Sequence, residues 1–429
     1  MLSAARVDSF FEELRWREFS RLERQRHAYL DYTGSALYAD SQLRAHQELL
    51  SSSIFGNPHS DSAPSRLSTA VMDDARSLVL RFLDADPETH DVIFTANTTA
   101  AIKLVAESYP FTRDTSCVLS ADNHNSVNGI REYARRAGAS LRVLPLDEEL
   151  RLRDVDLPAG PGLLAFPAQS NFSGVRHPLS IVRRAQQRGY DVLVDIASYA
   201  ASHAFSLRET PADFVALSFY KLFGYPTGLG ALVARRESLA RLQRPWFAGG
   251  TVLYASVGAD THRLQPRHER FEDGTPNFLS LAALPAGFAL LDEVQFPRLT
   301  AHVSALTSLL LDELRILPHV TIYGPTGMRD RGGTVAFNVR GVPYTEIEAR
   351  AAAARVSVRG GCFCNPGASE AAFGLENVRA CLDALGDTFT PARFAACTGG
   401  VAGAVRVSLG MANNADDVRR LVDVVRGAA

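Results

Sequence analysis

The sequence predicts an α/β protein whose main sheet is mostly parallel, followed by a smaller α+β domain. Three observations support this prediction. Apolar runs of strand length alternate with helical patterns over about the first 295 residues. Those runs are continuously hydrophobic, as expected for strands that helices cover on both faces. After about residue 295 the order changes, and 429 residues are enough for two domains around a cleft.

The predicted large domain spans residues 29–295 and follows an N-terminal arm over residues 1–28. The arm is amphipathic, with Phe10, Phe11 and Leu14 on one face. The strand-type runs and the helical patterns then alternate along the chain. The strand-type runs lie at 91–96, 116–120, 141–146, 163–168, 191–197, 213–219 and 230–234, and helical patterns between them include 98–109, 126–138 and 178–189.

The predicted small domain spans residues 296–429. It opens with a long helical pattern at 299–317 and ends with another at 416–427. Between these helices the sequence predicts a strand at 334–339, a helix near 344–354 and extended segments at 356–361 and 404–410. Such a mixture is typical of an α+β unit.

Charge and composition exclude several classes of protein. The 45 basic and 47 acidic residues leave a net charge of −2, so we expect neither a nucleic-acid partner nor a membrane surface. No apolar run approaches the roughly 20 residues of a membrane span, and the N-terminus lacks the apolar stretch of a signal peptide. Five cysteines are too few for a disulfide framework, and Cys117 and Cys381 are expected to be core residues. We therefore expect a cytoplasmic protein.

The basic residues are unevenly divided, since the chain has 43 arginines and only two lysines, Lys103 and Lys221. Arginine can replace lysine as a surface charge, but it cannot supply a neutral amine because the guanidinium stays protonated. Lys103 lies in a helical pattern, where an exposed helix charge is the simpler interpretation. Lys221 follows an apolar strand-type run and precedes a Gly/Pro bend. Burial there would lower its pKa, as an amine that attacks a carbonyl requires.

Polar side chains follow the strand-type runs, at the edge of a parallel sheet where ligands bind. They are Thr98 and Thr99 at a helix start, His124, the segment 169–171 with Asn171, Asp195, and Ser218 just before Lys221. Hydroxyls beside the free N–H groups of a helix start favour a phosphate. Each of these residues alone is more simply a cap or a turn residue. Together they supply what pyridoxal phosphate (PLP) requires: a lysine for its aldehyde, an acid for its pyridine nitrogen and donors for its phosphate.

Two neighbouring cysteines, Cys362 and Cys364, form a second candidate site. Metal binding is disfavoured because no further pair of cysteines or histidines accompanies them, and we predict no metal site. Buried, inert thiols are an alternative. Gly360 and Gly361 before the pair, and the segment Asn-Pro-Gly at 365–367 after it, favour an irregular and accessible loop.

The stretches that carry these residues resemble class V aminotransferase-fold enzymes. The resemblance is closest to the cysteine-desulfurase-like N-terminal domain of molybdenum cofactor sulfurases. The matching stretches run in family order from residue 29 to residue 410 and include YLDYTGSALY at 29–38, DNHNSVNGIRE at 122–132, SFYKLFGYPTGLGALV at 218–233 and VRGGCFCNPGA at 358–368. The resemblance implies the fold type I of PLP-dependent transferases and a homodimer.

The resemblance also implies how the cofactor is held. Lys221 resembles the lysine that forms a Schiff base with PLP, and Asp195 resembles the partner of the pyridine nitrogen. His124 resembles the imidazole that stacks on the ring and takes part in catalysis, and Asn171 resembles the partner of the ring hydroxyl. The residues that resemble phosphate donors are Thr98, Thr99, Ser218 and, from the neighbouring subunit, Thr251.

For the substrate, Arg406 resembles the clamp on an amino-acid carboxylate, with Arg359 helping to hold it. Cys364 occupies the position of the loop cysteine that takes sulfur from the substrate in cysteine desulfurases, and Arg359 would favour its thiolate. The implied reaction converts L-cysteine to L-alanine and leaves a persulfide on Cys364, which passes sulfur to an unknown acceptor.

Two other hypotheses remain open. Another PLP reaction on the same scaffold, such as a C–S lyase, aminotransferase or epimerase reaction, would make the cysteine pair incidental. A protein without a cofactor would make Lys221 incidental. The chain ends soon after the predicted small domain, so we expect it to lack the domain that receives the molybdenum cofactor in eukaryotic sulfurases.

Overall fold

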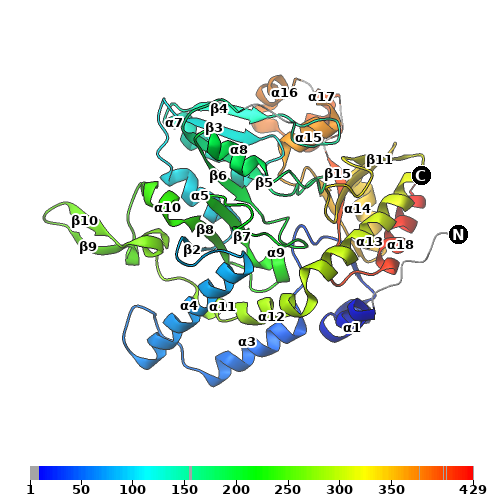
Figure 1. Ribbon diagram of the computed structural model, residues 1–429. Coiled ribbons are helices and arrows are strands. Elements are labelled where there is room, and N and C mark those ends of the chain that lie inside the picture. The colour runs from blue at the N-terminus through cyan, green and yellow to red at the C-terminus, as the bar shows by residue number, and fades with distance from the viewer. Residues whose placement is uncertain (1–8, 154–156, 376, 400, 402, 429) are drawn as a thin grey trace.

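The computed structural model describes residues 9–153, 157–375, 377–399, 401 and 403–428. A seven-stranded sheet occupies the centre of the molecule (Figure 1). All seven strands lie within two residues of the predicted runs, and the predicted α/β class is confirmed. In spatial order they are β2 (His90–Thr95), β8 (Gly230–Arg235), β7 (Phe214–Ser218), β6 (Tyr190–Asp195), β5 (Gly162–Pro167), β3 (Ser116–Ser120) and β4 (Ser140–Leu144).

Both faces of this sheet are buried. On β7, Val215 and Leu217 belong to one hydrophobic cluster, whereas Phe214 and Ala216 belong to another. Helices contribute to both clusters, which explains why the strand-type runs are continuously apolar. Those in the first cluster include α4 (Ala63–Phe82), α8 (Ile181–Gln187) and α12 (Leu284–Val294), and those in the second include α5 (Thr98–Ser108), α7 (Ile130–Arg136) and α10 (Arg236–Arg241).

One strand runs against the others. β8 pairs antiparallel with both β2 and β7, whereas β7, β6, β5, β3 and β4 pair in parallel. The segment 219–229 between β7 and β8 contains only the short helix α9 (Phe219–Phe223) and a bend. A parallel crossover needs about a dozen residues or more, so this connection reverses the chain instead. The carboxyl ends of β2, β3, β5, β6 and β7 therefore meet the amino end of β8 at one edge.

The smaller sheet has four antiparallel strands. Their spatial order is β11 (Val320–Tyr323), β12 (Thr334–Val339), β15 (Ala404–Ser408) and β14 (Arg359–Gly361). Three helices lie beside this sheet at the right of Figure 1, namely α13 (Phe296–Arg315), α14 (Tyr344–Ala353) and α18 (Ala415–Arg426). This α+β unit follows the large sheet in the chain, as the sequence predicts.

The first described elements pack against the last ones. They are helices α1 (Ser9–Glu18) and α2 (Arg21–Gln25) and strand β1 (Ala28–Tyr29), which pairs in parallel with β13 (Val356–Ser357). Phe11 and Leu14 of α1 are buried, and Arg15 Nη1 donates to Asp417 Oδ2 of α18 at 2.7 Å. Residues 1–8 of the predicted arm lie outside the described residues. The boundaries between arm, large domain and small domain stay a prediction.

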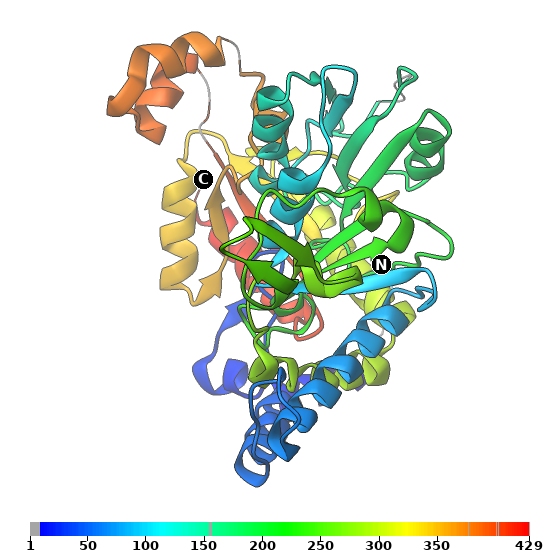
Figure 2. The same ribbon diagram turned by 90° about the vertical axis from the view of Figure 1, so that its left-hand side faces the viewer.

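A small helical lobe projects from the body between α15 (Pro366–Phe373) and β15 (Figure 2). Its helices are α16 (Val378–Leu385) and α17 (Pro391–Thr398), and a disulfide joins Cys381 to Cys397 across them. Cys381 is buried, as the sequence predicts, but it forms a disulfide and is not a free core thiol. Cys381 is the only buried residue described in these two helices. The lobe has almost no core of its own, and a covalent link takes its place.

Loss of this link should loosen the lobe alone. A disulfide that closes a loop with a sequence separation of 16 residues contributes about 3 kcal/mol. The C381S/C397S variant is expected to be cleaved faster by a protease within residues 378–398, because local opening exposes that segment. Limited proteolysis with mass spectrometry of the fragments measures this rate. An unchanged cleavage pattern would contradict the stapling role.

Within the described part of the chain, no single helix is long and apolar enough to cross a membrane. One bent pair, Phe278–Val294 with Phe296–Arg315, passes the same test by length and composition, with a bend of 71°.

Candidate active site

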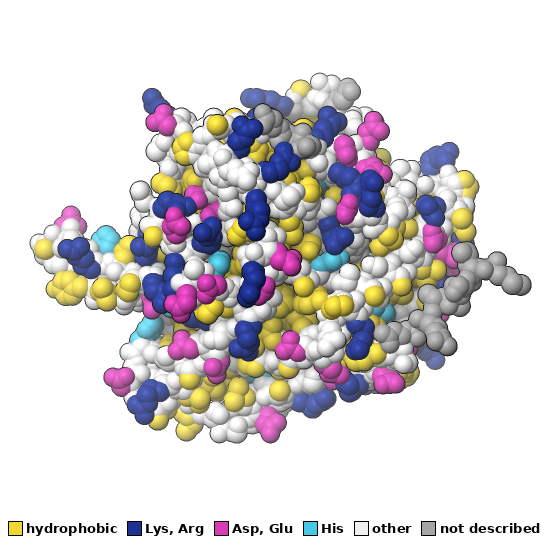
Figure 3. All heavy atoms as spheres, viewed as in Figure 1, with side chains coloured by type: hydrophobic (Ala, Val, Ile, Leu, Met, Phe, Trp, Pro, Cys, Tyr) yellow, Lys and Arg dark blue, Asp and Glu magenta, His cyan; other side chains and the backbone are white. Residues whose placement is uncertain are grey.

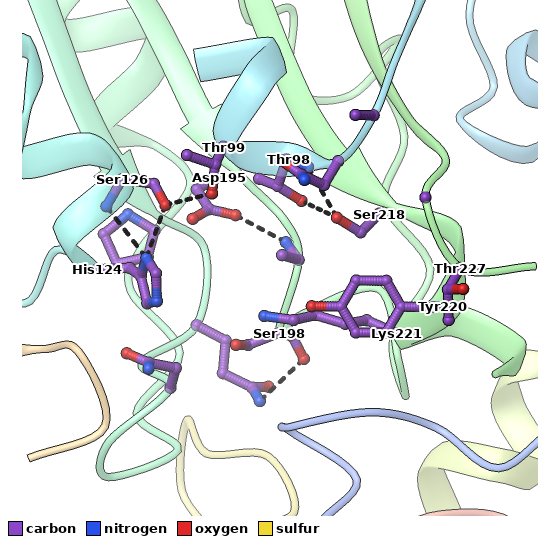
Figure 4. Close-up of a pocket in the computed structure, with 17 residues that line it drawn as sticks. Thr98, Thr99, His124, Ser126, Asp195, Ser198, Ser218, Tyr220, Lys221 and Thr227 are labelled. Carbon is purple, nitrogen blue, oxygen red and sulfur yellow. Dashed lines mark hydrogen bonds between the residues drawn. The ribbon is translucent and has the colours of Figure 1, made fainter. Parts of the chain in front are cut away.

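A cavity of about 290 Å³ opens at the edge where the strand ends meet. Its walls come from segments that follow β2, β3, β5, β6 and β7 and from the loop before β8 (Figure 4). Seven residues singled out in the sequence line it: Thr98, Thr99, His124, Asn171, Asp195, Ser218 and Lys221. The sheet topology thus brings together side chains that are far apart in the sequence.

Hydroxyl groups cluster at the start of α5. Ser218 Oγ accepts a hydrogen bond from the Thr98 backbone N–H at 2.8 Å and lies 2.6 Å from Thr98 Oγ1. Thr99 Oγ1 lies 2.7 Å from Ser126 Oγ. Asn97 caps the helix by accepting from the Ala100 N–H at 3.0 Å. This arrangement of hydroxyls and N–H groups at a helix start suits a phosphate.

An imidazole and a carboxylate lie beside the hydroxyl cluster (Figure 4), since Ser126 Oγ is 2.9 Å from His124 Nδ1. His124 Nδ1 accepts from the Ser126 N–H at 3.1 Å. Burial lowers the pKa of His124, and Lys221 lowers it further, whereas Asp195 opposes them. His124 is therefore a neutral ring at neutral pH. Asp195 is buried at the end of β6 and accepts from the Ala197 N–H at 2.9 Å.

Lys221 lies on α9 and extends into the cavity (Figure 4). Burial lowers its pKa, and Arg406 and Arg359 act in the same direction, whereas Asp195 raises it. At a given pH, a larger fraction of Lys221 than of a free lysine is therefore the neutral amine, which is the form that attacks a carbonyl. Lys103 instead lies on the surface, with 64% of its side chain exposed and Nζ 3.5 Å from Glu107 Oε2. The interpretation of Lys103 as an exposed helix charge is confirmed.

The structural cost of a buried amine can be measured. The lowered pKa of Lys221 means that the unfolded chain binds its proton more tightly, so folding stability rises with pH up to about 10.5, the ordinary value. Lys221→Met removes this group. The cofactor-free variant should melt at a higher temperature than the cofactor-free parent at pH 7, and the difference should shrink as the pH rises. Calorimetry across this range tests it, and a constant difference would contradict the lowered pKa.

Two arginines from the small sheet share one carboxylate beside the cavity. Arg406 is buried, and it donates from Nη2 to Asp31 Oδ1 at 2.9 Å and from Nη1 to the Asn171 carbonyl at 3.0 Å. Arg359 donates from Nη2 to Asp31 Oδ2 at 2.6 Å, which raises the pKa of Arg359. Neither arginine lines the cavity itself. Asp31 was missed from the sequence, although it lies in the stretch YLDYTG.

The cysteine loop lies against the same site. Cys362 and Cys364 carry exposed thiols, as the glycine-rich surroundings predict. The loop touches the cavity wall because the Asn125 N–H donates to the Cys364 carbonyl at 2.7 Å and Asn171 Nδ2 donates to the Phe363 carbonyl at 2.7 Å. Cys117 is a core residue, and burial raises the pKa of its thiol to about 12. Cys364 is thus free to react, and Cys117 is not.

Thr251 does not reach the cavity of its own chain. It is buried at the base of the hairpin formed by β9 (Val252–Ser256) and β10 (Thr261–Leu264), where its Oγ1 accepts from the Ala248 N–H at 2.9 Å. Other cavity residues were not assigned from the sequence, although several adjoin assigned ones. They include Ser126, Gln169, Ser198, Tyr220 and Thr227.

The residues present fit pyridoxal phosphate. The cavity supplies an amine of lowered pKa, a buried carboxylate, a neutral imidazole and a hydroxyl cluster at a helix start. Two buried polar atoms at the site, Gln169 Oε1 and Arg406 Nε, have no hydrogen-bond partner among the described residues. Within those residues no group of three or more His, Cys, Asp or Glu could hold a metal ion. The fold and the site together define a PLP-dependent enzyme of fold type I.

Comparison with known proteins gives the family. A model of the aminotransferase class-V family matches residues 28–421, and the chain belongs to this family. The molybdenum cofactor sulfurase of Arabidopsis thaliana is 34% identical over 96% of this chain and 57% of its own length. Molybdenum cofactor sulfurase 3 of Aedes aegypti is 36% identical over 95% of this chain and 57% of its own length. This chain therefore spans little more than half the length of these relatives.

Solved structures agree with this assignment. A cysteine desulfurase from Thermococcus onnurineus NA1 superposes with a TM-score of 0.82 at 26% identity and covers 99% of both chains. A cysteine desulfurase from Escherichia coli has a TM-score of 0.80 at 26% identity and covers 97% of this chain and 98% of its own. The fold of this chain is therefore similar to that of cysteine desulfurases, and its cofactor is pyridoxal phosphate.

Proposed function

We propose that the enzyme transfers sulfur from L-cysteine to Cys364 and then to a separate acceptor. In this reaction the Cys364 thiolate attacks the substrate sulfur, the bond between that sulfur and the substrate Cβ breaks, and an S–S bond forms. The substrate carbon takes up a proton and leaves as L-alanine, so a thiol and L-cysteine yield a persulfide and L-alanine. When bound, pyridoxal phosphate supplies the electron sink for the substrate α-carbon.

The observation that carries this proposal is the exposed thiol of Cys364 on a loop that touches the cofactor cavity. A lyase or an aminotransferase has no use for such a thiol. Around it, Arg406 and Arg359 already hold one carboxylate, that of Asp31, so their geometry suits an amino-acid carboxylate.

The remaining residues have roles toward the cofactor. Lys221 would bind its aldehyde and carry protons at Nζ, and Asp195 would hold the pyridine nitrogen. His124, kept neutral by burial, would stack on the ring. Asn171 would meet the ring hydroxyl. The phosphate would lie among the hydroxyls of Thr98, Thr99 and Ser218, with Thr251 from a partner subunit.

The products from L-cysteine test the proposal against its alternatives. The purified enzyme should form L-alanine and a protein persulfide. A C–S lyase would form pyruvate, ammonia and sulfide instead. An aminotransferase or epimerase would act on other amino acids in a panel and leave L-cysteine sulfur in place.

We also propose that the working unit is a homodimer. Exposed apolar side chains gather on the β9–β10 hairpin, at the left of Figure 3, where 64% of Leu253, 66% of Tyr254 and 99% of Val257 are exposed. Contiguous exposed apolar surface of this kind favours an interface. Thr251 lies at the base of the same hairpin, so a dimer through it would bring Thr251 toward a partner's cavity.

Thr251→Val tests the shared site. Loss of one phosphate donor should weaken cofactor binding about tenfold, whereas Thr261→Val on the exposed end of the hairpin should leave it unchanged. Absorbance titration of the cofactor measures the affinity, and light scattering gives the mass of the particle. A monomer that binds the cofactor and turns over at full rate would contradict the proposal.

The proposed location is the cytoplasm, because five cysteines among 429 residues suit a reducing compartment. A reducing compartment would open the Cys381–Cys397 disulfide. The redox state of this pair, trapped by alkylation in intact cells, therefore tests the location.

A further inference from the structure

A buried polar network lies beside the cysteine loop, and its central residue has no role in the reaction described above. Its centre is Asp122, which follows β3 and is fully buried. Asp122 Oδ1 accepts from Asn365 Nδ2 at 2.7 Å and from Ser170 Oγ at 2.8 Å. Asp122 Oδ2 accepts from His177 Nε2 at 2.7 Å. A buried carboxylate persists only when such donors surround it.

Asn365, which directly follows Cys364, links this network to the loop. Its Nδ2 also donates to the Asp122 carbonyl at 3.1 Å and to Asn171 Oδ1 at 2.9 Å. Its backbone N–H donates to the Cys362 carbonyl at 3.0 Å and closes a tight turn around the two cysteines. One amide group therefore fixes the loop to two residues that follow strands of the large sheet, one of which lines the cofactor cavity.

The loop itself has a conformation that needs such support. Phe363 and Cys364 have φ values of 57° and 55°, in the left-handed region that side chains other than glycine rarely adopt. Gly367 packs so closely on the Ala121 carbonyl that a Cβ would clash there. Two consecutive strained residues persist only when the surroundings hold them.

We propose that the Asp122–Asn365 pair is the positioning device that holds the Cys364 thiol over the cofactor cavity. The inference rests on the proposed sulfur transfer to Cys364. Both residues act through the loop backbone and neither lines the cofactor cavity, so they are positioning residues.

A purely structural role for Asn365 is the alternative, because its Oδ1 also caps α15 by accepting from the Ala368 N–H at 3.2 Å. The variant N365D separates the two roles. Aspartate is as good a helix cap as asparagine. In N365D, however, a carboxylate oxygen replaces the Nδ2 donor. This acceptor would lie against two other acceptors, the Asp122 carboxylate and Asn171 Oδ1.

The holoenzyme carrying N365D should therefore keep its cofactor absorbance and its KM for L-cysteine. Its kcat for L-alanine formation should fall about tenfold or more, since a small misplacement of a reacting group has this effect. Amide hydrogen exchange in the peptide 362–369 should accelerate. The double variant D122N/N365D restores a donor and an acceptor to the pair, because the new amide can donate to the new carboxylate. It should recover slow exchange and part of the lost kcat.

The matched control is N414D, since Asn414 caps α18 by accepting from the Asp417 N–H at 3.1 Å and lies outside the cavity. It should leave kcat and exchange unchanged. Unchanged exchange and kcat in N365D would overturn the inference, and so would a double variant that recovers neither. The exchange measurement needs no turnover. If Cys364→Ser keeps full L-alanine formation, the proposed function fails while this readout still reports on the anchor.

Discussion

Lys221→Ala is expected to abolish retention of the cofactor and to lower turnover by at least about 10³-fold. The reason is that Lys221 is the only one of the two lysines that lies in the cavity, beside Asp195 and His124. Its burial lowers its pKa and frees the amine. The visible absorbance of the purified protein, together with an assay for L-alanine, measures both effects.

Lys103→Arg is the matched control, because Lys103 is exposed and pairs with Glu107 across one helical turn. This variant should keep both the absorbance and the activity. Peptide mapping after borohydride reduction should find the pyridoxyl group on Lys221. A pyridoxyl group on Lys103 would refute the site assignment.

Cys364→Ser is expected to retain the cofactor and still bind L-cysteine, yet to lose L-alanine formation and the protein persulfide together. The cofactor and the thiol perform separate parts of the reaction, because one labilises the substrate and the other removes its sulfur. A serine hydroxyl at this position cannot form a persulfide. We expect a loss of at least about 10³-fold, with the absorbance change on adding L-cysteine preserved.

Cys362→Ser should be milder, with slower sulfur transfer and continued L-alanine formation. Phe363, whose side chain is buried, lies between the two cysteines in the sequence, and the backbone has positive φ values at both Phe363 and Cys364. Undiminished L-alanine formation by Cys364→Ser would refute the desulfurase assignment and favour the lyase or aminotransferase alternative.

The large sheet was predictable because its strands are buried on both faces. Runs such as 214–217 are apolar at every position, and their short length favours a buried strand over a buried helix. The site residues follow from the same logic, since parallel strands end at one edge and bring residues such as Thr98, Asp195 and Lys221 together. For these residues the local sequence pattern and the topology of the sheet lead to the same prediction.

The features that the sequence did not predict depend on contacts between distant segments. β8 runs antiparallel to β7 because only a short segment joins the two strands. The apolar run that forms β8 does not indicate this direction. Asp31 meets Arg406 across 375 residues of chain, and no local pattern marks such a pair. The Cys381–Cys397 disulfide is equally invisible, because its two helices look like ordinary amphipathic segments.

The most direct test of the account follows the sulfur atom itself. The wild-type holoenzyme, mixed with one equivalent of sulfur-labelled L-cysteine and no acceptor, should yield one equivalent of L-alanine. Mass spectrometry should find the added labelled sulfur on the peptide that contains Cys364. Release of pyruvate, ammonia and labelled sulfide, with Cys364 unmodified, would contradict the account.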